Sequence, residues 1–384
     1  MTPHPFLLPT LPTLADTPTA QIAAALAGPG LWLDIGLVTL RVRSDAPALA
    51  AQLQSVYRHF PLQTAGDWAD LHIDLWRPCS PRRWLRPQVV FHCDGVAPFD
   101  PFPADTALPL LEWGANWLIG RRCNDHLLFH AGVVERDGHA LLMPALPGSG
   151  KSTLTAALSQ RGWRLLSDEF GAYDWRQGHF VPALKPVALK NESIEVIRRF
   201  GCRVDASTAQ AAELGPSFPK TRKGTVAHLA PSAAAVRGVH TPAWPGAIVL
   251  PRWQAGAGTT LQPVQPAMAF SSLAFNAFNY TVCAADGFDA AVALIDAVPA
   301  WQLIYSDLDD ALRTLAGEWP AVVARAQARR ADLRRDADAL LPAALTPRTT
   351  PITAPITTSV AAPSSTPADP AATAAALAAA GLDR

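Results

Sequence analysis

The stretch Ala145-Leu-Pro-Gly-Ser-Gly-Lys-Ser-Thr153 decides how the chain should fold around it. An apolar run, Ala140-Leu-Leu-Met143, precedes it, and a helical pattern from Leu154 towards Gly162 follows it. A strand, a glycine-rich turn and a helix opening on Lys-Ser-Thr form a cradle for phosphate groups, because the N–H groups of the turn and the helix N-terminus present partial positive charge to an anion. The sequence therefore predicts a nucleoside triphosphate site.

The residues of this loop have distinct expected tasks. Lys151 is expected to reach the terminal phosphates and the Ser152 hydroxyl to ligate Mg²⁺. The first position of the G-x-x-x-x-G-K-[ST] pattern is Ala145 in place of glycine, but glycine matters most where φ is positive or a phosphate presses on the backbone, which Gly148 and Gly150 can serve. An ordinary glycine-rich turn is the alternative interpretation. The residues expected to bind the nucleotide are Pro147, Gly148, Ser149, Gly150, Lys151, Ser152 and Thr153.

Two adjacent carboxylates, Asp168 and Glu169, follow the next expected strand, Arg164-Leu-Leu-Ser167. The carboxyl ends of strands are the side of an open α/β sheet where ligands bind. Two acids there can divide the work, one orienting a metal ion and the other accepting the proton of an attacking hydroxyl. Adjacent acids in an exposed loop are otherwise usually just solvated.

A histidine lies just upstream, in the expected strand Leu127-Leu-Phe-His-Ala-Gly-Val-Val134. A lone histidine in an apolar strand is more often a hydrogen-bonded core residue than a catalyst. Gly132, however, indicates that something approaches the backbone of this strand closely. His130 is therefore kept as a candidate.

The overall composition limits the possible partners. Lys+Arg and Asp+Glu both number 32 in 384 residues, so a basic surface for nucleic acid or membrane is not expected. The five scattered cysteines favour reduced thiols over a disulfide framework or a zinc site. Prolines interrupt the N-terminal apolar residues, no signal peptide is recognisable, and no apolar run reaches the ~20 residues of a membrane helix. A cytoplasmic protein is expected.

The periodicity of apolar residues divides the chain into four parts. Residues 1–16 are expected to be flexible, 17–104 to form an N-terminal α+β region, and 105–341 to form the domain that carries the loop. Residues 342–384 are rich in Thr, Pro and Ala and are expected to be disordered, because they can bury too little apolar surface to offset their ordering entropy.

At these motifs the sequence resembles the HPr kinase/phosphorylase group, and more closely the HprK-related kinases of the HPr-rel-A type. Three segments carry the resemblance jointly: Phe129-His-Ala-Gly132, Gly148-Ser-Gly-Lys-Ser-Thr153 and Gly162-Trp-Arg-Leu-Leu-Ser-Asp-Glu169. Further matching segments are Arg86–Phe91, Pro109–Trp117, Lys185–Ser193, Thr221–His228 and Tyr305–Leu308, so the resemblance covers about residues 30 to 315.

This resemblance implies an α/β fold, with the sheet-and-helix core shared by P-loop HPr kinases and PEP carboxykinases. It implies an ATP- and Mg²⁺-dependent kinase acting on a serine of a small protein or peptide. Asp168 would be the base, assisted by His130, while Lys151 would hold the phosphates. Glu169 and Ser152 would hold the metal. Two alternatives are a nucleotide-binding regulator without catalysis and a small-molecule kinase.

Two departures limit what the resemblance implies. The bifunctional enzymes carry a Glu-x-Arg-Gly signature, where this chain has Leu189-Lys-Asn-Glu-Ser-Ile194, so phosphorolysis of phosphoserine is not expected. The N-terminal region also differs from theirs, which leaves a homo-oligomer as an open alternative.

Four cations remain as candidates for phosphate or acceptor contacts, because phosphoryl transfer rewards positive charge around the phosphoryl oxygens. Arg222 is assigned to nucleotide binding, and ordinary surface charge is the alternative for each cation. The segment Thr221–Thr225 is expected to be a mobile loop with Gly224 as its hinge. The four cations are Lys190, Lys220, Arg222 and Lys223.

Overall fold

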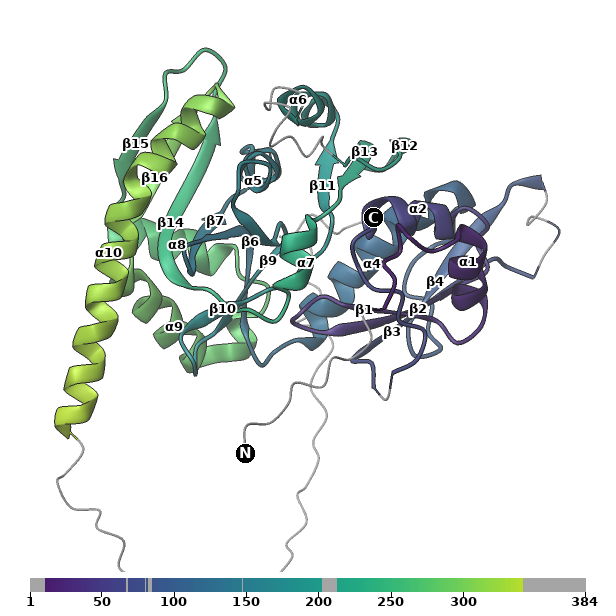
Figure 1. Ribbon diagram of the computed structural model, residues 1–384, viewed down its shortest axis with the longest axis horizontal. Coiled ribbons are helices and arrows are strands. Elements are labelled where there is room, and N and C mark those ends of the chain that lie inside the picture. Colours follow the sequence, from purple (N-terminus) through teal and green to yellow (C-terminus); the bar gives the residue numbers. More distant parts are fainter. Residues whose placement is uncertain are drawn as a thin grey trace, which may run out of the picture. The chain divides into compact units, whose positions relative to one another are not determined.

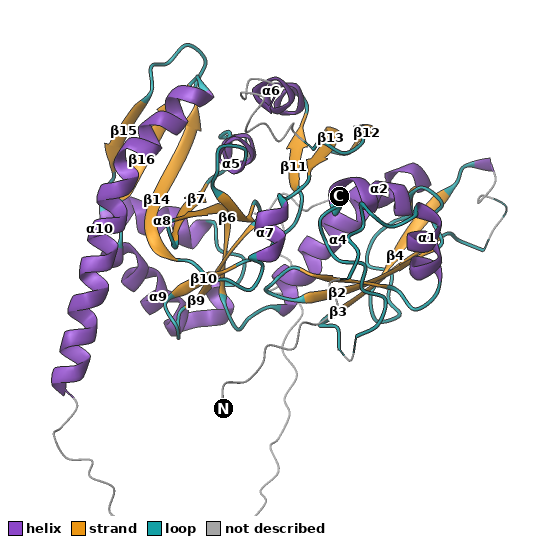
Figure 2. Ribbon diagram, in the orientation of Figure 1, coloured by secondary structure: helices purple, strands orange, loops and turns teal. Residues whose placement is uncertain are grey.

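The computed structural model describes residues 11–66, 68–79, 81, 85–146, 148–201 and 213–340. The predictions for residues 1–10, for Pro147 and for the tail 342–384 lie outside the described residues. The chain divides into two units, Met1–Arg334 and Arg335–Arg384. All elements below belong to the first unit except the C-terminal end of the last helix. The protein is a mixed α/β structure with three sheets (Figures 1 and 2).

The first sheet has five strands in the order β1-β2-β3-β4-β5. Only β2 and β3 are parallel, and helix α2 connects them. Along β2, β3 and β4 buried and less buried residues alternate, as expected for a sheet with one face in the core. The elements are α1 (Thr19–Ala27), β1 (Leu31–Asp34), β2 (Thr39–Ser44), α2 (Leu49–Val56), β3 (Leu71–Trp76), β4 (Gln88–His92), β5 (Phe102–Pro103), the 3₁₀ turn η1 (Ala104–Thr106) and α4 (Ala107–Arg122).

The second sheet has eight strands and contains the strand that leads into the glycine-rich loop. Its order is β10-β9-β6-β7-β14-β16-β15, and β8 pairs with β6 beside this path. The pairs β7–β14 and β14–β16 are parallel, and the remaining pairs are antiparallel. The strands are β6 (Leu127–Arg136), β7 (His139–Pro144), β8 (Arg164–Ser167), β9 (Phe170–Asp174), β10 (His179–Val181), β14 (Trp244–Trp253), β15 (Thr260–Pro263) and β16 (Ala300–Tyr305).

Helices cover both faces of this sheet because the inner strands are apolar on both sides. Leu127, Phe129 and Val133 of β6 share a core with α8 (Pro266–Phe275) and α9 (Tyr280–Ala297). Leu128 and Val134, with alternate side chains on the same strand, share the other core with α5 (Lys151–Ser159) and α10 (Leu308–Leu340). Because side chains alternate along a strand, His130 and Gly132 lie on the same face of β6 as Leu128 and Val134, which is the face covered by α5.

The third sheet is small, with the antiparallel order β11-β13-β12. The predicted mobile loop lies here, and it is the tight connection of the β12–β13 hairpin, since Thr221 pairs with Gly224. Gly224 has φ +83°, and a Cβ there would lie 2.3 Å from Asn191 Oδ1, so a local packing requirement accounts for this glycine. The elements are β11 (Val187–Lys190), α6 (Glu192–Gly201), β12 (Phe218–Thr221), β13 (Gly224–Leu229) and α7 (Ala233–Arg237).

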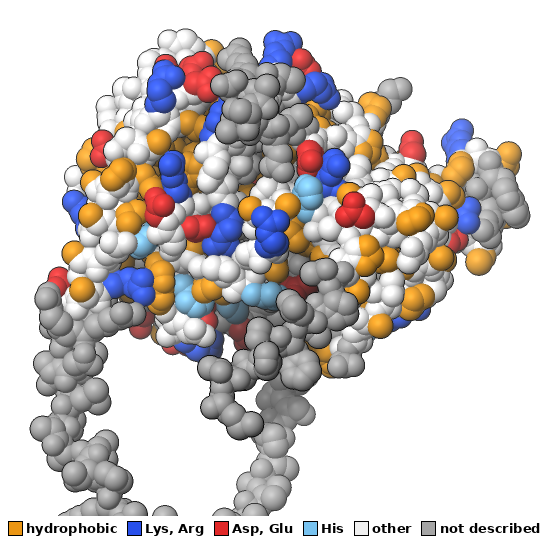
Figure 3. All heavy atoms as spheres, in the orientation of Figure 1, with side chains coloured by type: hydrophobic (Ala, Val, Ile, Leu, Met, Phe, Trp, Pro, Cys, Tyr) orange, Lys and Arg blue, Asp and Glu red, His pale blue; other side chains and the backbone are white. Residues whose placement is uncertain are grey.

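The first sheet and the loop-bearing part share one hydrophobic core. Leu33 and Leu53 belong to the same buried cluster as Leu154 of α5 and Leu189 of β11. Among the described residues no helix is long and apolar enough to cross a membrane. On the face drawn in Figure 3, acidic and basic side chains are interspersed.

Candidate nucleotide-binding and phosphoryl-transfer site

The glycine-rich loop joins the end of β7 to the start of α5. Gly148 has φ +86° and Gly150 has φ +92°, so both glycines predicted to need a left-handed backbone adopt one. Gly150 is the N-cap residue of α5, and Lys151 begins the helix. The described part of the loop therefore has the strand–turn–helix form that directs backbone N–H groups towards an anion.

The neighbouring parallel strands hold this loop from one side. The backbone N–H of Trp253, at the end of β14, donates to the carbonyl of Ser149 over 3.0 Å. The Tyr305 hydroxyl, at the end of β16, donates to the carbonyl of Gly150 over 3.3 Å. A Cβ at Gly150 would lie only 2.7 Å from the Tyr305 hydroxyl oxygen. Glycine is thus required at position 150 for space as well as for conformation.

On the other side of the loop, Lys151 meets the first of the two acids. The Lys151 side chain is buried, and its ammonium donates a hydrogen bond to the backbone carbonyl of Asp168. The same Nζ lies 3.9 Å from the carboxylate atom Asp168 Oδ1, and the two side chains are only 9% and 6% exposed. Residues 17 positions apart in the sequence are thereby brought into contact.

Asp168 is held at the end of β8 by a turn that uses the preceding serine. Ser167 Oγ accepts hydrogen bonds from the backbone N–H groups of Glu169 and Phe170. Burial raises the pKa of Asp168 to about 6, against the opposing effects of Lys151 and of a hydrogen bond from Ser152. Asp168 Oδ1 has no hydrogen-bond partner within the described part of the chain. A buried carboxylate with a free oxygen and a pKa near neutrality is suited to accept a proton.

Glu169 and His130 lie next to this pair. His130 Nε2 is 3.6 Å from Glu169 Oε1, and both side chains are about one-third exposed. Burial and then Lys151 lower the pKa of His130 to about 4, so its ring is neutral at pH 7. Burial works to raise the pKa of Glu169, but the nearby cations, Lys151 foremost, outweigh it and lower the pKa. At neutral pH, Glu169 is therefore an anion beside an uncharged imidazole.

Pairing of the central strands explains why these residues meet. β6 pairs with both β8 and β9, and the backbone N–H of Ala131 donates to the Glu169 carbonyl over 3.2 Å. The His130 ring lies 5.5 Å from the ring of Phe278, measured between centroids. The ladder between β6 and β9 places His130 opposite Phe170, directly after the two acids.

The close approach at Gly132 has a packing cause. A Cβ at Gly132 would lie 2.2 Å from Thr155 Oγ1 of α5. The helix that follows the loop thus packs directly on the backbone of β6. Gly132 sets the distance between this helix and the strand of His130, so its role is structural.

The four candidate cations differ in position. Lys190, at the end of β11, and Lys223 both lower the pKa of His130 through their charge. Both also interact electrostatically with Glu169. Lys223 also lies over the Trp113 ring, at 5.4 Å from its centroid. Arg222, predicted to bind the nucleotide, lies over Phe102 at 5.4 Å from the ring centroid, with its Nη2 3.8 Å from Asp100 Oδ2. The Lys220 side chain lies outside the described residues.

A buried ionic network beneath the site was not predicted. Lys185 Nζ lies 3.0 Å from Glu112 Oε2, and both side chains are less than 10% exposed. Tyr57 donates to Glu112 over 2.7 Å, and Lys185 also donates to the Asn116 side chain. The network connects α2 and α4 to the segment before β11, and Lys185 contributes to the low pKa of Glu169.

One sequence signal points to these cations. The chain contains five lysines and 27 arginines, which together make the 32 basic residues. Arginine supplies the surface charge elsewhere, whereas every lysine lies between positions 151 and 223. Of the four whose side chains are described, Lys151, Lys185 and Lys190 act on Glu169, and Lys223 interacts with it as well. The four described lysines thus place compact, strongly hydrated ammonium groups around the acids.

The residues fit one Mg²⁺ ion shared with phosphate oxygens, but no complete protein cage. No three His, Cys, Asp or Glu side chains cluster as a metal site in the described part of the molecule. Mg²⁺ is commonly bound through one or two carboxylates together with substrate phosphates. The Ser152 hydroxyl and the ionised Glu169 supply oxygen ligands of this kind.

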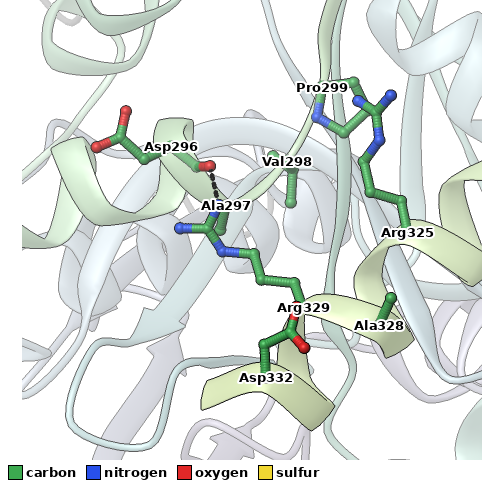
Figure 4. Close-up of a pocket in the computed structure, with 8 residues that line it drawn as sticks. All are labelled: Asp296, Ala297, Val298, Pro299, Arg325, Ala328, Arg329 and Asp332. Carbon is green, nitrogen blue, oxygen red and sulfur yellow. Dashed lines mark hydrogen bonds between the residues drawn. The ribbon is translucent and has the colours of Figure 1, made fainter. Parts of the chain in front are cut away.

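Two pockets lie away from these residues. One, of about 420 Å³, is lined by the end of α9 and by Arg325, Arg329 and Asp332 of α10, and Arg329 there donates to the Asp296 carbonyl (Figure 4). The other, of about 370 Å³, lies between α8 and α9 and includes Phe270 and Phe288. Neither is lined by Lys151, Asp168 or His130.

Searches against models of protein families and against curated proteins found no match to this chain.

Proposed function

We propose that this chain is a P-loop kinase of the HprK-related type, which transfers the terminal phosphoryl group of ATP to a serine of a small protein or peptide. The observation that carries the proposal is the ion pair of Lys151 with Asp168 beside the glycine-rich loop, in which the buried Asp168 Oδ1 has no hydrogen-bond partner among the described residues.

The loop and Lys151 account for nucleotide binding in this proposal. Backbone N–H groups at the start of α5 bind phosphate oxygens, and Lys151 exchanges the Asp168 carbonyl for a terminal phosphate. Ser152 and Glu169 hold Mg²⁺, which neutralises charge on the phosphate oxygens when bound. In this arrangement the positive charges of Lys151 and Mg²⁺ would lie next to the phosphoryl group as it is transferred and would stabilise it.

Asp168 accepts the proton of the acceptor in the proposed reaction. The serine Oγ forms a bond to the terminal phosphorus as its proton passes to the Asp168 carboxylate, and the bond from phosphorus to the bridging oxygen breaks, releasing ADP. With a pKa of about 6, Asp168 is about nine-tenths ionised at pH 7 and still basic enough to take a proton. In this proposal the neutral His130, whose Nε2 lies 3.6 Å from Glu169 Oε1, assists Asp168 without adding a positive charge.

Retention of a buried, poorly paired carboxylate favours catalysis over simple nucleotide sensing. Burial opposes the ionisation of Asp168 and raises its pKa. Perturbed pKa values of this kind are typical of catalytic acids and bases. A binding-only regulator needs the loop and Lys151 but has no use for a free basic oxygen beside them.

Calorimetric titration with Mg-ATP, followed by transfer kinetics, tests this assignment. Lys151→Met should weaken ATP binding by at least about 100-fold, while Lys223→Met, at an exposed lysine of the β12–β13 hairpin, should leave most of the affinity. Asp168→Asn should retain ATP binding and lose phosphoryl transfer. Glu169→Gln should mainly lower the affinity for Mg²⁺. Loss of Mg²⁺ affinity in Asp168→Asn, with turnover preserved at saturating Mg²⁺, would reverse the roles of the two acids.

A further inference from the structure

The opposite side of the glycine-rich loop carries an exposed aromatic side chain that the phosphoryl chemistry does not use. Trp253, the last residue of β14, is 51% exposed, and its neighbour Arg252 is also exposed, whereas residues 246–249 in the middle of the strand are buried. Its backbone N–H donates to Ser149 of the loop, and its Cβ would lie 3.1 Å from a Cβ at Gly150. The ring therefore begins directly beside the phosphate-binding backbone.

The Trp253 ring is held in place and not merely exposed. Its indole Nε1 donates to the Ser306 carbonyl over 3.3 Å, and Ser306 Oγ donates to the Ala257 carbonyl over 2.7 Å. The backbone N–H of Gln254 donates to the Tyr305 carbonyl over 2.9 Å. These bonds tie the segment after β14 to the end of β16. An indole fixed by its polar edge still offers a face for stacking.

The order of the strands gives the loop two different sides. β7, which leads into the loop, lies between β6 and β14. His130, Asp168 and Glu169 lie on the β6 side, because β8 and β9 both pair with β6. Trp253 lies on the β14 side. A nucleotide whose terminal phosphates reach Lys151 and Asp168 must therefore extend its base away from β6.

From this arrangement we infer that Trp253 is the base-binding residue of the site and stacks on the nucleobase of a nucleoside triphosphate. The inference deepens the proposed function and rests on it. Stacking on an indole face recognises a flat π-system and is tolerant of its edge groups, so ATP and GTP should be bound alike. The recognised ligand class is thus the nucleoside triphosphate, with selectivity over ligands that lack a base.

Binding of Mg-ATP, Mg-GTP and Mg-tripolyphosphate, measured by calorimetry, tests the inference with and without a base. Trp253→Ala should weaken ATP and GTP by about 5- to 150-fold and leave tripolyphosphate unchanged, because base–aromatic stacking has that range. Trp253→Phe should keep most of the ATP affinity. Trp68→Ala, which removes another exposed tryptophan, 75% exposed, should change neither ligand.

Three results would overturn the inference. An unchanged ATP affinity in Trp253→Ala would show that the ring does not stack on the base, and an equal loss of ATP and tripolyphosphate affinity would make Trp253 only a support of the loop. Wild-type protein that binds ATP no more tightly than tripolyphosphate would refute base binding without any variant, even if Trp253→Ala failed to fold. Wild-type protein that binds neither ligand would instead refute the proposed function.

Discussion

Replacement of Asp168 by asparagine should stabilise the fold at neutral pH while it removes the proposed catalytic base. The pKa of this buried carboxyl rises from 3.8 to about 6 in the folded protein. By linkage, that rise corresponds to as much as about 3 kcal/mol of lost stability once the group is ionised in both states. Such a cost is typical of a side chain retained for function and not for folding.

The sign of the pH dependence follows from the direction of the pKa change. Below about pH 3.8 the carboxyl is protonated in folded and unfolded protein alike, and ionisation costs nothing. As the pH rises through 3.8 the unfolded chain ionises more easily than the folded one, so the penalty grows, and it is complete above about pH 6. The penalty is about 1 kcal/mol at pH 4.5 and about 3 kcal/mol at pH 7.5.

Urea unfolding of wild type and Asp168→Asn at these two pH values is the assay. The free energy of unfolding of the variant, relative to wild type, should increase by about 2 kcal/mol from pH 4.5 to pH 7.5. This increase does not depend on how well the asparagine amide fits, because that contribution is the same at both pH values. Asp100→Asn, at an 85% exposed side chain, should show no such trend. A relative stability of Asp168→Asn that is independent of pH, or that falls as pH rises, would refute the account of this carboxyl.

Three further predictions concern the packing around the site and its pH dependence. Gly132→Ala should destabilise the protein by about 1–3 kcal/mol, because its Cβ meets Thr155 Oγ1, and Thr155→Ala in the same chain should recover much of the loss in a denaturation experiment. Glu112→Ala should cost about 3–5 kcal/mol in unfolding free energy, since it leaves Lys185 buried without its carboxylate, and a second change, Lys185→Met, should restore most of it; a loss that Lys185→Met leaves in place would show that the charge is not the cause. The transfer rate should rise about tenfold from pH 5 to pH 7 and then level off, because Asp168 must be ionised to accept a proton and its pKa is about 6; a flat profile in rapid-quench measurements would count against Asp168 as the base.

Sequence reasoning worked best where chemistry and local periodicity act together. The strand at 164–167 has the predicted bounds, and the glycines of the loop adopt the backbone conformations expected of them. The acids follow their strand as predicted, because a short apolar run bounded by polar residues fixes both ends of the strand.

Two elements were missed or misjudged for identifiable reasons. The helix α9, Tyr280–Ala297, has small residues, a non-helical Ala284 and Gly287 in its first half, so its periodicity is weak. The segment 221–225 is polar and contains a glycine, and it was predicted to be a mobile loop. In the structure Thr221 pairs with Gly224, so only the two residues between them form the turn of a hairpin. Local composition alone does not separate these cases.

The remaining parts of the site depend on contacts between residues far apart in the chain. Lys185 and Glu112 are 73 positions apart, and Trp253 reaches the loop only because β14 pairs with β7. Arg222 carries the same charge as Lys223, but the hairpin directs it towards Asp100 and Phe102. Such pairings follow from strand order, which the sequence pattern did not determine.

The measurement that tests the central claim most directly is intact-mass spectrometry of candidate acceptors. Small proteins and peptides encoded by neighbouring genes are incubated with Mg-ATP and either wild-type protein or Asp168→Asn. The account predicts that wild type adds one phosphoryl group at a serine and that Asp168→Asn, although it binds ATP, adds none. Equal modification by both proteins would contradict the role of Asp168. ATP binding by wild type with no acceptor modified across the set would contradict the kinase assignment in favour of a nucleotide-binding regulator.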